Sequence, residues 1–430
     1  MSLIDSPTVA APDAVSPVPR SKKQRRIRQF VFLALAMFVL LSIVRVAADA
    51  DALTSSITVG AALRATIPIL LAGLAALWAD RVGIVNIGIE GMMILGTWFG
   101  GWAAWEWGAW VGVFAAIVGG SIGGFIHCVA VTRFNVDHVI SGVAINILAF
   151  GSMRYLSELI FVGEQGGGIT QSPQQSSSIG KISLPYLSGG ADTADALGNL
   201  EDRGWFLISD AAGIIRGLTV DVSYLSIIAL LLVPISGFIL WRTRFGLRVR
   251  SSGEQPYAAE SLGVRIAPLR YWAMIISGGL AGLGGGFLAI VATSFYRQGQ
   301  TQSRGYIGLA TSIFGNYRPS GVLGGSALFG FGEALQLVGS KAVPKLFLLF
   351  AIIAGLAALR AIIRRTAKSA IVLSVCSFIS LILFLTVDEV PEPLTKSVPF
   401  VLTLIVLGTS AQRLRPPAFG GRPFRSGEEH

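Results

Sequence analysis

The chain has 430 residues, of which 53% are hydrophobic and 13% are charged. About a quarter of the residues in a soluble domain are charged, so this composition excludes an ordinary soluble globular protein. Several apolar runs reach the roughly 20 residues that a helix needs to cross about 30 Å of hydrocarbon, and no series of short alternating segments is seen. We therefore predict an all-α protein, a polytopic bundle of transmembrane helices.

The net charge of +10 at pH 7 raises the question of nucleic-acid binding. The arginines, however, cluster at the ends of apolar runs, as membrane orientation predicts, and no basic face with interleaved aromatic residues is present. Nucleic acid is therefore not an expected partner. The two cysteines, Cys128 and Cys376, lie in apolar runs, so we expect small buried side chains and no disulfide.

Residues 1–29 are rich in Pro, Ala and Ser and end in a basic cluster, which predicts a disordered cytosolic tail. The apolar run from Phe30 to Val44 is followed by Arg45 and small residues, a pattern that also fits a cleaved signal peptide. We favour an uncleaved span, because the tail is long for a signal peptide and Arg45 lies close to the cleavage zone.

Four apolar segments follow, at about 59–79, 86–104, 108–130 and 137–161, and the short turns between them predict neighbouring helices. The polar stretch 162–222 contains seven acidic residues against three basic ones, which places it outside the cytosol. It is either a docking surface for an external binding protein or a flexible loop.

After a span at about 224–241, the polar segment 242–270 carries six arginines and forms a cytosolic loop. Its centre predicts a short helix, because Pro256 fits a first helical turn, Ala258 and Ala259 favour helix, and Gly263 can end it. Such a helix is either a surface on which a cytosolic partner acts or part of an ordinary basic loop.

The residues of this loop carry a resemblance. Gly253 to Ala259, followed by Gly263-Val264, resembles the coupling segment of the permeases in ABC importers for nucleosides and simple sugars. Gln255 stands where that family often has asparagine. In the family this segment docks into a groove on the ATPase subunit. The resemblance thus implies an ATPase-coupling role for Glu254, Gln255, Pro256, Tyr257, Ala258, Ala259 and Gly263.

A second polar feature interrupts the apolar runs between Asp80 and Gly96. Asn86 and Glu90 are four residues apart, so we expect both on one face of a helix. A carboxylate inside a span costs roughly 2.5–3.5 kcal/mol, so Glu90 should face the bundle or a cavity. Three roles remain open for Glu90: a hydrogen-bonded structural residue, a lining of the solute path, or a proton relay.

The block from Arg81 to Gly96 resembles the hallmark of one of the two permease subunits of nucleoside ABC importers. Asn135 to Gly151 and Gly305 to Gly325 resemble later blocks of that family, with departures at 137–138 and 312–313, and Arg413 to Phe424 resembles its ending. The resemblance implies a nucleoside or simple-sugar permease in the bacterial plasma membrane. Its expected partners are an ATPase subunit, a second permease subunit, an extracytoplasmic solute-binding (lipo)protein and membrane lipid. The candidate residues that line the path are Asn86, Glu90, Asn146 and Asn316.

The span at about 271–292 holds Gly278, Gly282 and Gly286 at a spacing of four, which predicts tight packing of that face against another helix. Residues 306–316 are too short for a straight span and predict a half-length helix beside protein or a cavity. With spans at about 321–339, 344–362, 369–386 and 398–411, we expect about twelve crossings and both termini in the cytosol.

This count exceeds the roughly ten spans of the resembled family. The excess lies in residues 341–395, which we interpret as an inserted apolar hairpin within a transmembrane permease domain of residues 30–411. Residues 412–430 then form a basic cytosolic tail.

The sequence contains no convincing catalytic, nucleotide-binding or metal-binding motif. Residues 119–123 spell G-x-S-x-G but lie inside an apolar span, where small-residue packing explains them. No P-loop motif and no metal-ligand spacing occurs, so we expect no catalytic, cofactor or metal site and ATP hydrolysis on another subunit. The alternative function is an ion- or proton-coupled secondary transporter, which the broken segments at 80–90 and 306–319 would also suit.

Overall fold

The computed structural model describes residues 35–36, 38–48, 50–190, 193–338, 343–363, 366–387 and 414–425. Within these ranges the strands are β1 (Lys181–Ile182) and β2 (Val222–Ser223), an antiparallel pair, and nearly all other regular structure is helical. The predicted all-α class is confirmed. Seven helices of the described residues are long and apolar enough to cross a membrane, so this is a multi-pass membrane protein. The count of about twelve crossings stays a prediction, and the segment 398–411 lies outside the described residues.

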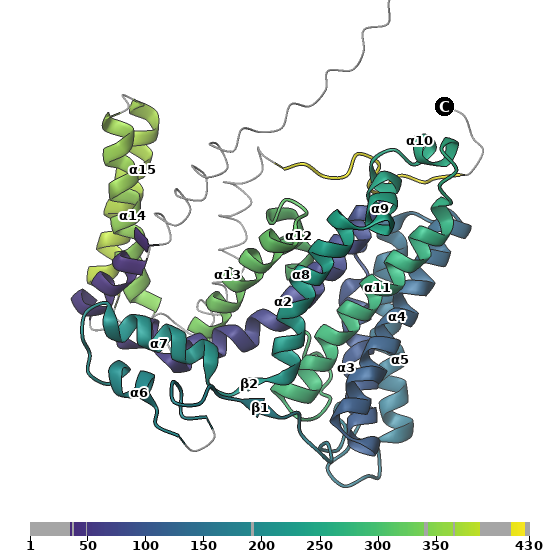
Figure 1. The fold of residues 1–430 in the computed structure, drawn as a ribbon, viewed down its shortest axis with the longest axis horizontal. Coiled ribbons are helices and arrows are strands. Elements are labelled where there is room, and N and C mark those ends of the chain that lie inside the picture. Colours follow the sequence, from purple (N-terminus) through teal and green to yellow (C-terminus); the bar gives the residue numbers. More distant parts are fainter. Residues whose placement is uncertain are drawn as a thin grey trace, which may run out of the picture.

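Helix α2 (Ser56–Val82) runs through the middle of the bundle, between α11 (Ile266–Phe287), α12 (Arg304–Phe314) and α13 (Pro319–Val338) (Figure 1). Every residue from Thr66 to Asp80 is buried. A helix that is apolar on all sides is stable only where protein or lipid surrounds it, and here protein does.

A second layer consists of α3 (Ile89–Trp107) and α4 (Ala109–Arg133), which pack against α11, and α5 (His138–Ile160), which packs on α3 and α4. The predicted glycine face of α11 is confirmed. A Cβ atom added at Gly278 would clash with the carbonyl of Gly120, and one at Gly282 would clash with that of Ala116. The same contact explains the G-x-S-x-G sequence of residues 119–123, because Gly120 is where the two backbones meet.

The break between α2 and α3 differs from the prediction. Helix α2 ends at Gly83, whose φ of 89° is left-handed, and α3 begins only at Ile89. Asn86 therefore lies in the non-helical connection, and the expectation that it shares a helix face with Glu90 is wrong. The half-length helix is present as α12, whose 11 residues span about 16 Å. The π-helix η2 (Leu288–Ala292) follows α11.

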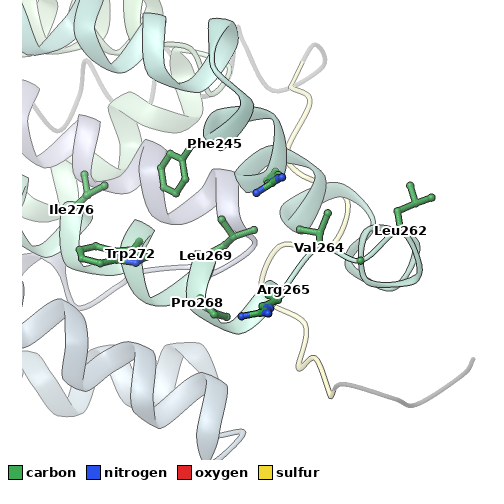
Figure 2. A pocket seen from close by; sticks show the side chains of 10 residues that line it. Phe245, Leu262, Val264, Arg265, Pro268, Leu269, Trp272 and Ile276 are labelled. Carbon is green, nitrogen blue, oxygen red and sulfur yellow. The ribbon is translucent and has the colours of Figure 1, made fainter.

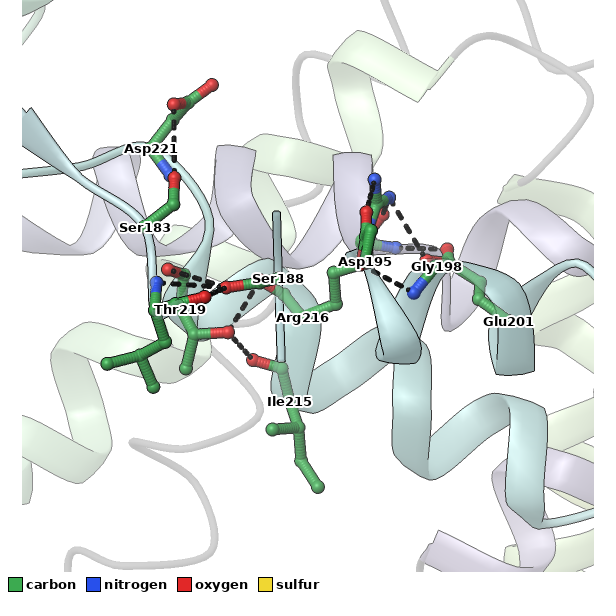
Figure 3. A network of polar contacts seen from close by, with 11 residues as sticks. Ser183, Ser188, Asp195, Gly198, Glu201, Ile215, Arg216, Thr219 and Asp221 are labelled. Atoms are coloured by element: carbon green, nitrogen blue, oxygen red, sulfur yellow. Dashed lines mark hydrogen bonds and ion pairs between the residues drawn. The ribbon is translucent and has the colours of Figure 1, made fainter. Parts of the chain in front are cut away.

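Two short helices, α6 (Ala196–Glu201) and α7 (Ile208–Thr219), form one end of the molecule, together with the β1–β2 pair (Figure 1). Arg216 connects them through ion pairs with Asp195 at 2.7 Å and Glu201 at 3.3 Å (Figure 3). A further buried ion pair joins Asp210 of α7 to Arg45 at 2.8 Å. Within the segment 162–222, residues 195–216 are therefore held in place by charged contacts.

Helix α8 (Tyr224–Arg242) runs from β2 to the opposite end, which carries α9 (Arg244–Glu254) and α10 (Pro256–Ser261). The predicted hairpin within 341–395 consists of α14 (Val343–Ile363) and α15 (Ala367–Thr386), which pack on each other and stand apart from the main bundle (Figure 1). The short 3₁₀ helix η1 (Asp51–Leu53) precedes α2, and a helix at 38–48 precedes η1.

The prediction that both cysteines are buried holds for Cys128 only. Cys128 is buried in α4, whereas Cys376 is exposed on α15, because that helix has little protein around it apart from α14. Both are free thiols.

Candidate functional site

The short helix predicted within residues 242–270 is present as α10, with Pro256 in its first turn and Gly263, at φ 82°, just beyond its end. Gln255 occupies the N-cap but its side chain makes no capping hydrogen bond, as its departure from asparagine suggests. Pro256 and Ala259 are buried, whereas Glu254, Gln255 and Ala258 flank them closer to solvent.

The described C-terminal residues, Leu414 to Arg425, run across α10 and form what we call the C-terminal segment. The ring of Tyr257 lies 5.7 Å from that of Phe419 and 5.1 Å from that of Phe424. The Phe419 N–H donates to the Gly253 carbonyl at 3.0 Å, and the Gly421 N–H donates to the Gly83 carbonyl at 3.1 Å. The C-terminal segment thus ties α10 to the break between α2 and α3.

Arg81, at the end of α2, connects the same elements from the inside. Its guanidinium donates to the Tyr317 carbonyl at 2.6 Å and lies 3.7 Å from the Glu254 carboxylate. The other Glu254 oxygen accepts from the Ala418 N–H at 3.2 Å. Sequence reasoning did not single out Arg81, although it opens the hallmark block, because nothing local shows that it reaches the coupling helix.

Arg270 lies beneath the C-terminal segment with no exposed surface. None of its guanidinium nitrogens has a hydrogen-bond partner among the described residues, and its carbon centre lies 5.2 Å from the centroid of the Phe424 ring. A buried cation without a carboxylate partner is costly, so this aromatic contact matters for the stability of the α10 end.

Glu90 lies in the first turn of α3 with 8% of its surface exposed. Its two oxygens accept from the Ser303 N–H at 3.1 Å and from the Gly305 N–H at 2.8 Å. These donors belong to the N-terminus of α12, where N–H groups have no partner within the helix and negative charge is favoured. Glu90 thereby fixes the start of the half-length helix.

Asn146 of α5 is half-buried beside this contact. Its oxygen accepts from the Gly91 N–H at 2.7 Å, and its amide donates to the Ile87 carbonyl at 3.1 Å and to the Tyr306 hydroxyl at 2.8 Å. The structure thus brings Asn146 and Glu90 together where α3 and α12 begin. Tyr306, 43% exposed, completes this polar centre, and sequence reasoning missed it because a lone tyrosine in an apolar run carries no signal.

The other two candidates lie elsewhere. Asn86 is fully buried, and its amide donates to the Ser277 hydroxyl at 3.2 Å, which in turn donates to the Ala75 carbonyl. Asn316, with φ at 52°, lies in the turn between α12 and α13, and its oxygen accepts from the Arg415 N–H at 2.9 Å. Asn316 therefore contacts the C-terminal segment, away from the polar centre.

Comparison with known proteins identifies the family of this chain. A family model described as the branched-chain amino acid transport system / permease component matches residues 58–359. The chain belongs to this permease family. The matched residues include α10 and the polar centre of Glu90, Asn146 and Tyr306, but not the C-terminal segment.

Named relatives agree. The guanosine ABC transporter permease protein NupQ of Bacillus subtilis (strain 168) is 35% identical over 308 residues, which cover 69% of this chain and 88% of that protein. The nucleoside ABC transporter permease protein NupC of Lactococcus lactis subsp. cremoris is 28% identical over 65% of this chain and 84% of its own length. The putative glucose ABC transporter permease protein TsgC13 of Haloferax volcanii is 32% identical over 64% of this chain and 76% of its own length.

No solved structure is significantly similar to this permease. Its relatives are transport permeases and not enzymes, so it is the membrane-spanning permease subunit of an ABC importer.

Proposed function

We propose that this permease forms half of the translocation unit of a nucleoside importer, driven by a separate ATPase subunit that docks on α10. The observation that carries the proposal is the connection of α10 to the core helix α2, through the 3.7 Å contact between Glu254 and Arg81. Because α10 is connected to the buried central helix α2 through Glu254, a force that the ATPase subunit exerts on α10 can be transmitted to the helix bundle.

Nucleoside is the preferred solute because two relatives named above carry guanosine or nucleoside in their names, and a simple sugar is the alternative because a third carries glucose. The polar centre supports an uncharged hydroxyl-bearing solute. The Tyr306 hydroxyl accepts from the Asn146 amide and keeps its own hydrogen for a solute, and Asn146 lies half-buried beside it. The Glu90 oxygens are buried and already accept from backbone donors. We therefore assign path lining to Asn146 and Tyr306, and positioning of α12 to Glu90.

The same contacts suggest a route for the movement. A displacement of α10 acts on Arg81 through Glu254 and on Gly83 through the C-terminal segment. Both lie at the start of the break that leads to Asn86 and Glu90, and Glu90 holds the N-terminus of α12. Movement at α10 thereby reaches the polar centre through residues 83–90, and Asn86 anchors this connection to α11.

The proposal also assigns the orientation of the permease in the membrane and its remaining partners. The α10 end and both termini lie in the cytosol of a bacterium, and the segment 162–222 on the opposite side receives an extracytoplasmic solute-binding protein. A second permease subunit completes the unit.

The test is uptake of radiolabelled guanosine by cells that lack other nucleoside carriers and express the complete transporter. Deletion of Gln255 to Leu262 should abolish uptake and co-purification of the ATPase, while the permease still inserts in the membrane. Arg360→Gln, an exposed change on α14, is the matched control and should leave both unchanged.

Two results would overturn the proposal. One is full uptake after the deletion. The other is uphill uptake by the permease alone in vesicles with a proton gradient, which would make it a secondary transporter.

A further inference from the structure

A cavity of about 590 Å³ opens beside the coupling helix, between α9 and the first turns of α11 (Figure 2). Phe245 and Arg248 of α9 line one side, Arg265 lies at the start of α11, and Leu269, Trp272 and Ile276 follow along α11. No part of the proposed solute path or of the contact between Arg81 and Glu254 belongs to this cavity.

The lining has a charged part and an apolar part, and they are separated along α11. At 1.5 Å per residue, Ile276 lies about 16 Å farther along the chain axis than Arg265. By length and composition the candidate span is Ile266–Ala292, so we place the Arg265 end at the membrane surface and the Ile276 end within the hydrocarbon. Trp272, 60% exposed, lies between them, at the depth where tryptophan is enriched in membrane proteins.

The two arginines are unpaired. Neither Arg248 nor Arg265 forms an ion pair or a side-chain hydrogen bond with any residue that the structure describes. Arginine presents a planar set of donors that matches phosphate geometry, and basic residues at this level attract anionic lipids. Two unpaired guanidinium groups above an apolar wall are complementary to a phosphate that carries acyl chains.

We propose that this cavity binds one anionic phospholipid of the cytosolic leaflet. Arg248 and Arg265 hold its phosphate, and its acyl chains lie along Trp272 and Ile276. The choice of leaflet rests on the orientation proposed above. Because the lipid contacts α9, α11 and the residues that follow α10, it braces the base of the coupling helix.

The test is native mass spectrometry of the complete, delipidated transporter, titrated with dioleoylphosphatidylglycerol or with dioleoylphosphatidylcholine. We expect a persistent phosphatidylglycerol adduct that survives at least about tenfold better than the phosphatidylcholine adduct. The double variant Arg248→Gln/Arg265→Gln should remove this preference, and the control Arg360→Gln should keep it. Equal binding of the two lipids, or an unchanged preference in the double variant, would overturn the proposal.

A second measurement does not depend on the folding of the arginine variants. Brominated phosphatidylglycerol should quench the tryptophan fluorescence of the unaltered transporter more than brominated phosphatidylcholine does, and Trp272→Phe should abolish the difference. Quenching that is the same with Trp272→Phe would place the lipid elsewhere and contradict the site.

The competing occupant is the ATPase subunit. If Arg248→Gln/Arg265→Gln releases the ATPase while the lipid adducts are unchanged, the cavity is a protein interface and the lipid proposal is wrong. Neither lipid measurement uses solute or ATP. The results for lipid binding therefore stay valid if the solute is not a nucleoside, or if α10 does not couple to the ATPase. Normal uptake without lipid preference would refute the lipid site alone.

Discussion

The two ends of the permease are held together by different kinds of contact. At the α7 end, one ion pair of 2.7 Å joins Arg216 to Asp195 (Figure 3), and another of 2.8 Å joins Arg45 to Asp210. At the α10 end, the contact between Arg81 and Glu254 is 3.7 Å long. The other contacts there are aromatic rings, backbone hydrogen bonds and hydrogen bonds between a side chain and the backbone, such as that from Arg81 to the Tyr317 carbonyl. The proposed function assigns these two ends different parts: the α7 end, with its short ion pairs, is a fixed platform, and the α10 end is the part that shifts.

The largest effect should come from breaking the platform. Asp210 is buried and accepts hydroxyl hydrogen bonds from Ser42 and Thr54, each at 2.6 Å, besides pairing with Arg45. Asp210→Asn removes the buried charge partner of Arg45 and leaves it only the exposed Asp51, at 3.1 Å, which should lower the free energy of unfolding by about 3 kcal/mol. Thermal unfolding, followed by dye labelling of the buried Cys128 in a Cys376→Ser background, measures this change.

The matched control for this variant is Asp221→Asn, because Asp221 is exposed in the same region and only accepts a 3.4 Å hydrogen bond from Ser183. Equal losses of stability in the two variants would show that the buried pair has no special part in the platform.

The next effect tests the ring contacts at the opposite end. Phe424→Ala uncovers the Arg270 guanidinium and removes a desolvated cation–π contact of about 2 kcal/mol. We expect hydrogen exchange of residues 256–261 to accelerate by about tenfold or more, with the α7 end unchanged. Phe424→Trp should retain the protection, and loss of protection in both variants would indicate that ring shape rather than the cation decides.

A smaller change in stability is expected at the long ion pair. Glu254 is half-exposed, so Glu254→Gln should alter the free energy of unfolding by less than about 1 kcal/mol. Its effect should appear in function, as more ATP hydrolysed for each solute molecule taken up. Glu158→Gln, at an exposed position on α5, should not change that ratio. Unchanged coupling in Glu254→Gln would remove Arg81 from the proposed route.

The smallest effect is a pH dependence of the platform. The hydrogen bond from Arg216 lowers the pKa of Asp195 below its ordinary value of 3.8. A carboxylate with a lowered pKa stabilises the fold above its ordinary pKa, and that contribution is lost as the pH falls through the lowered value. Exchange protection of α6 and α7 should therefore fall below about pH 4 in the unaltered protein, and Asp195→Asn should flatten this dependence.

The features that the sequence predicts correctly depend on local signals. Pro256 and Gly263 delimit α10, and the spacing of Gly278 and Gly282 already defines the packed face of α11. The prediction that Asn86 lies on the α3 helix is wrong, because α3 begins only at Ile89. Its first turn is held by a residue distant in sequence, Asn146, which accepts from the Gly91 N–H. No pattern within one segment can report such a contact.

The same limit applies to the site. The docking of the C-terminal segment on α10 joins residues more than 150 positions apart, and Arg81 meets Glu254 across a similar distance. The resemblance identified Glu254 and Tyr257 as parts of one segment. Their contacts with Arg81 and Phe424, which connect that segment to the core, needed the structure.

The enclosure of α2 has a consequence for the membrane around the permease. From Thr66 to Asp80 this helix is surrounded by protein, whereas α5 and α15 turn most of their surface outward. Bilayer thickness acts on a helix through direct contact with acyl chains. The central helix is therefore shielded from changes in bilayer thickness, which act on the peripheral helices through tilting.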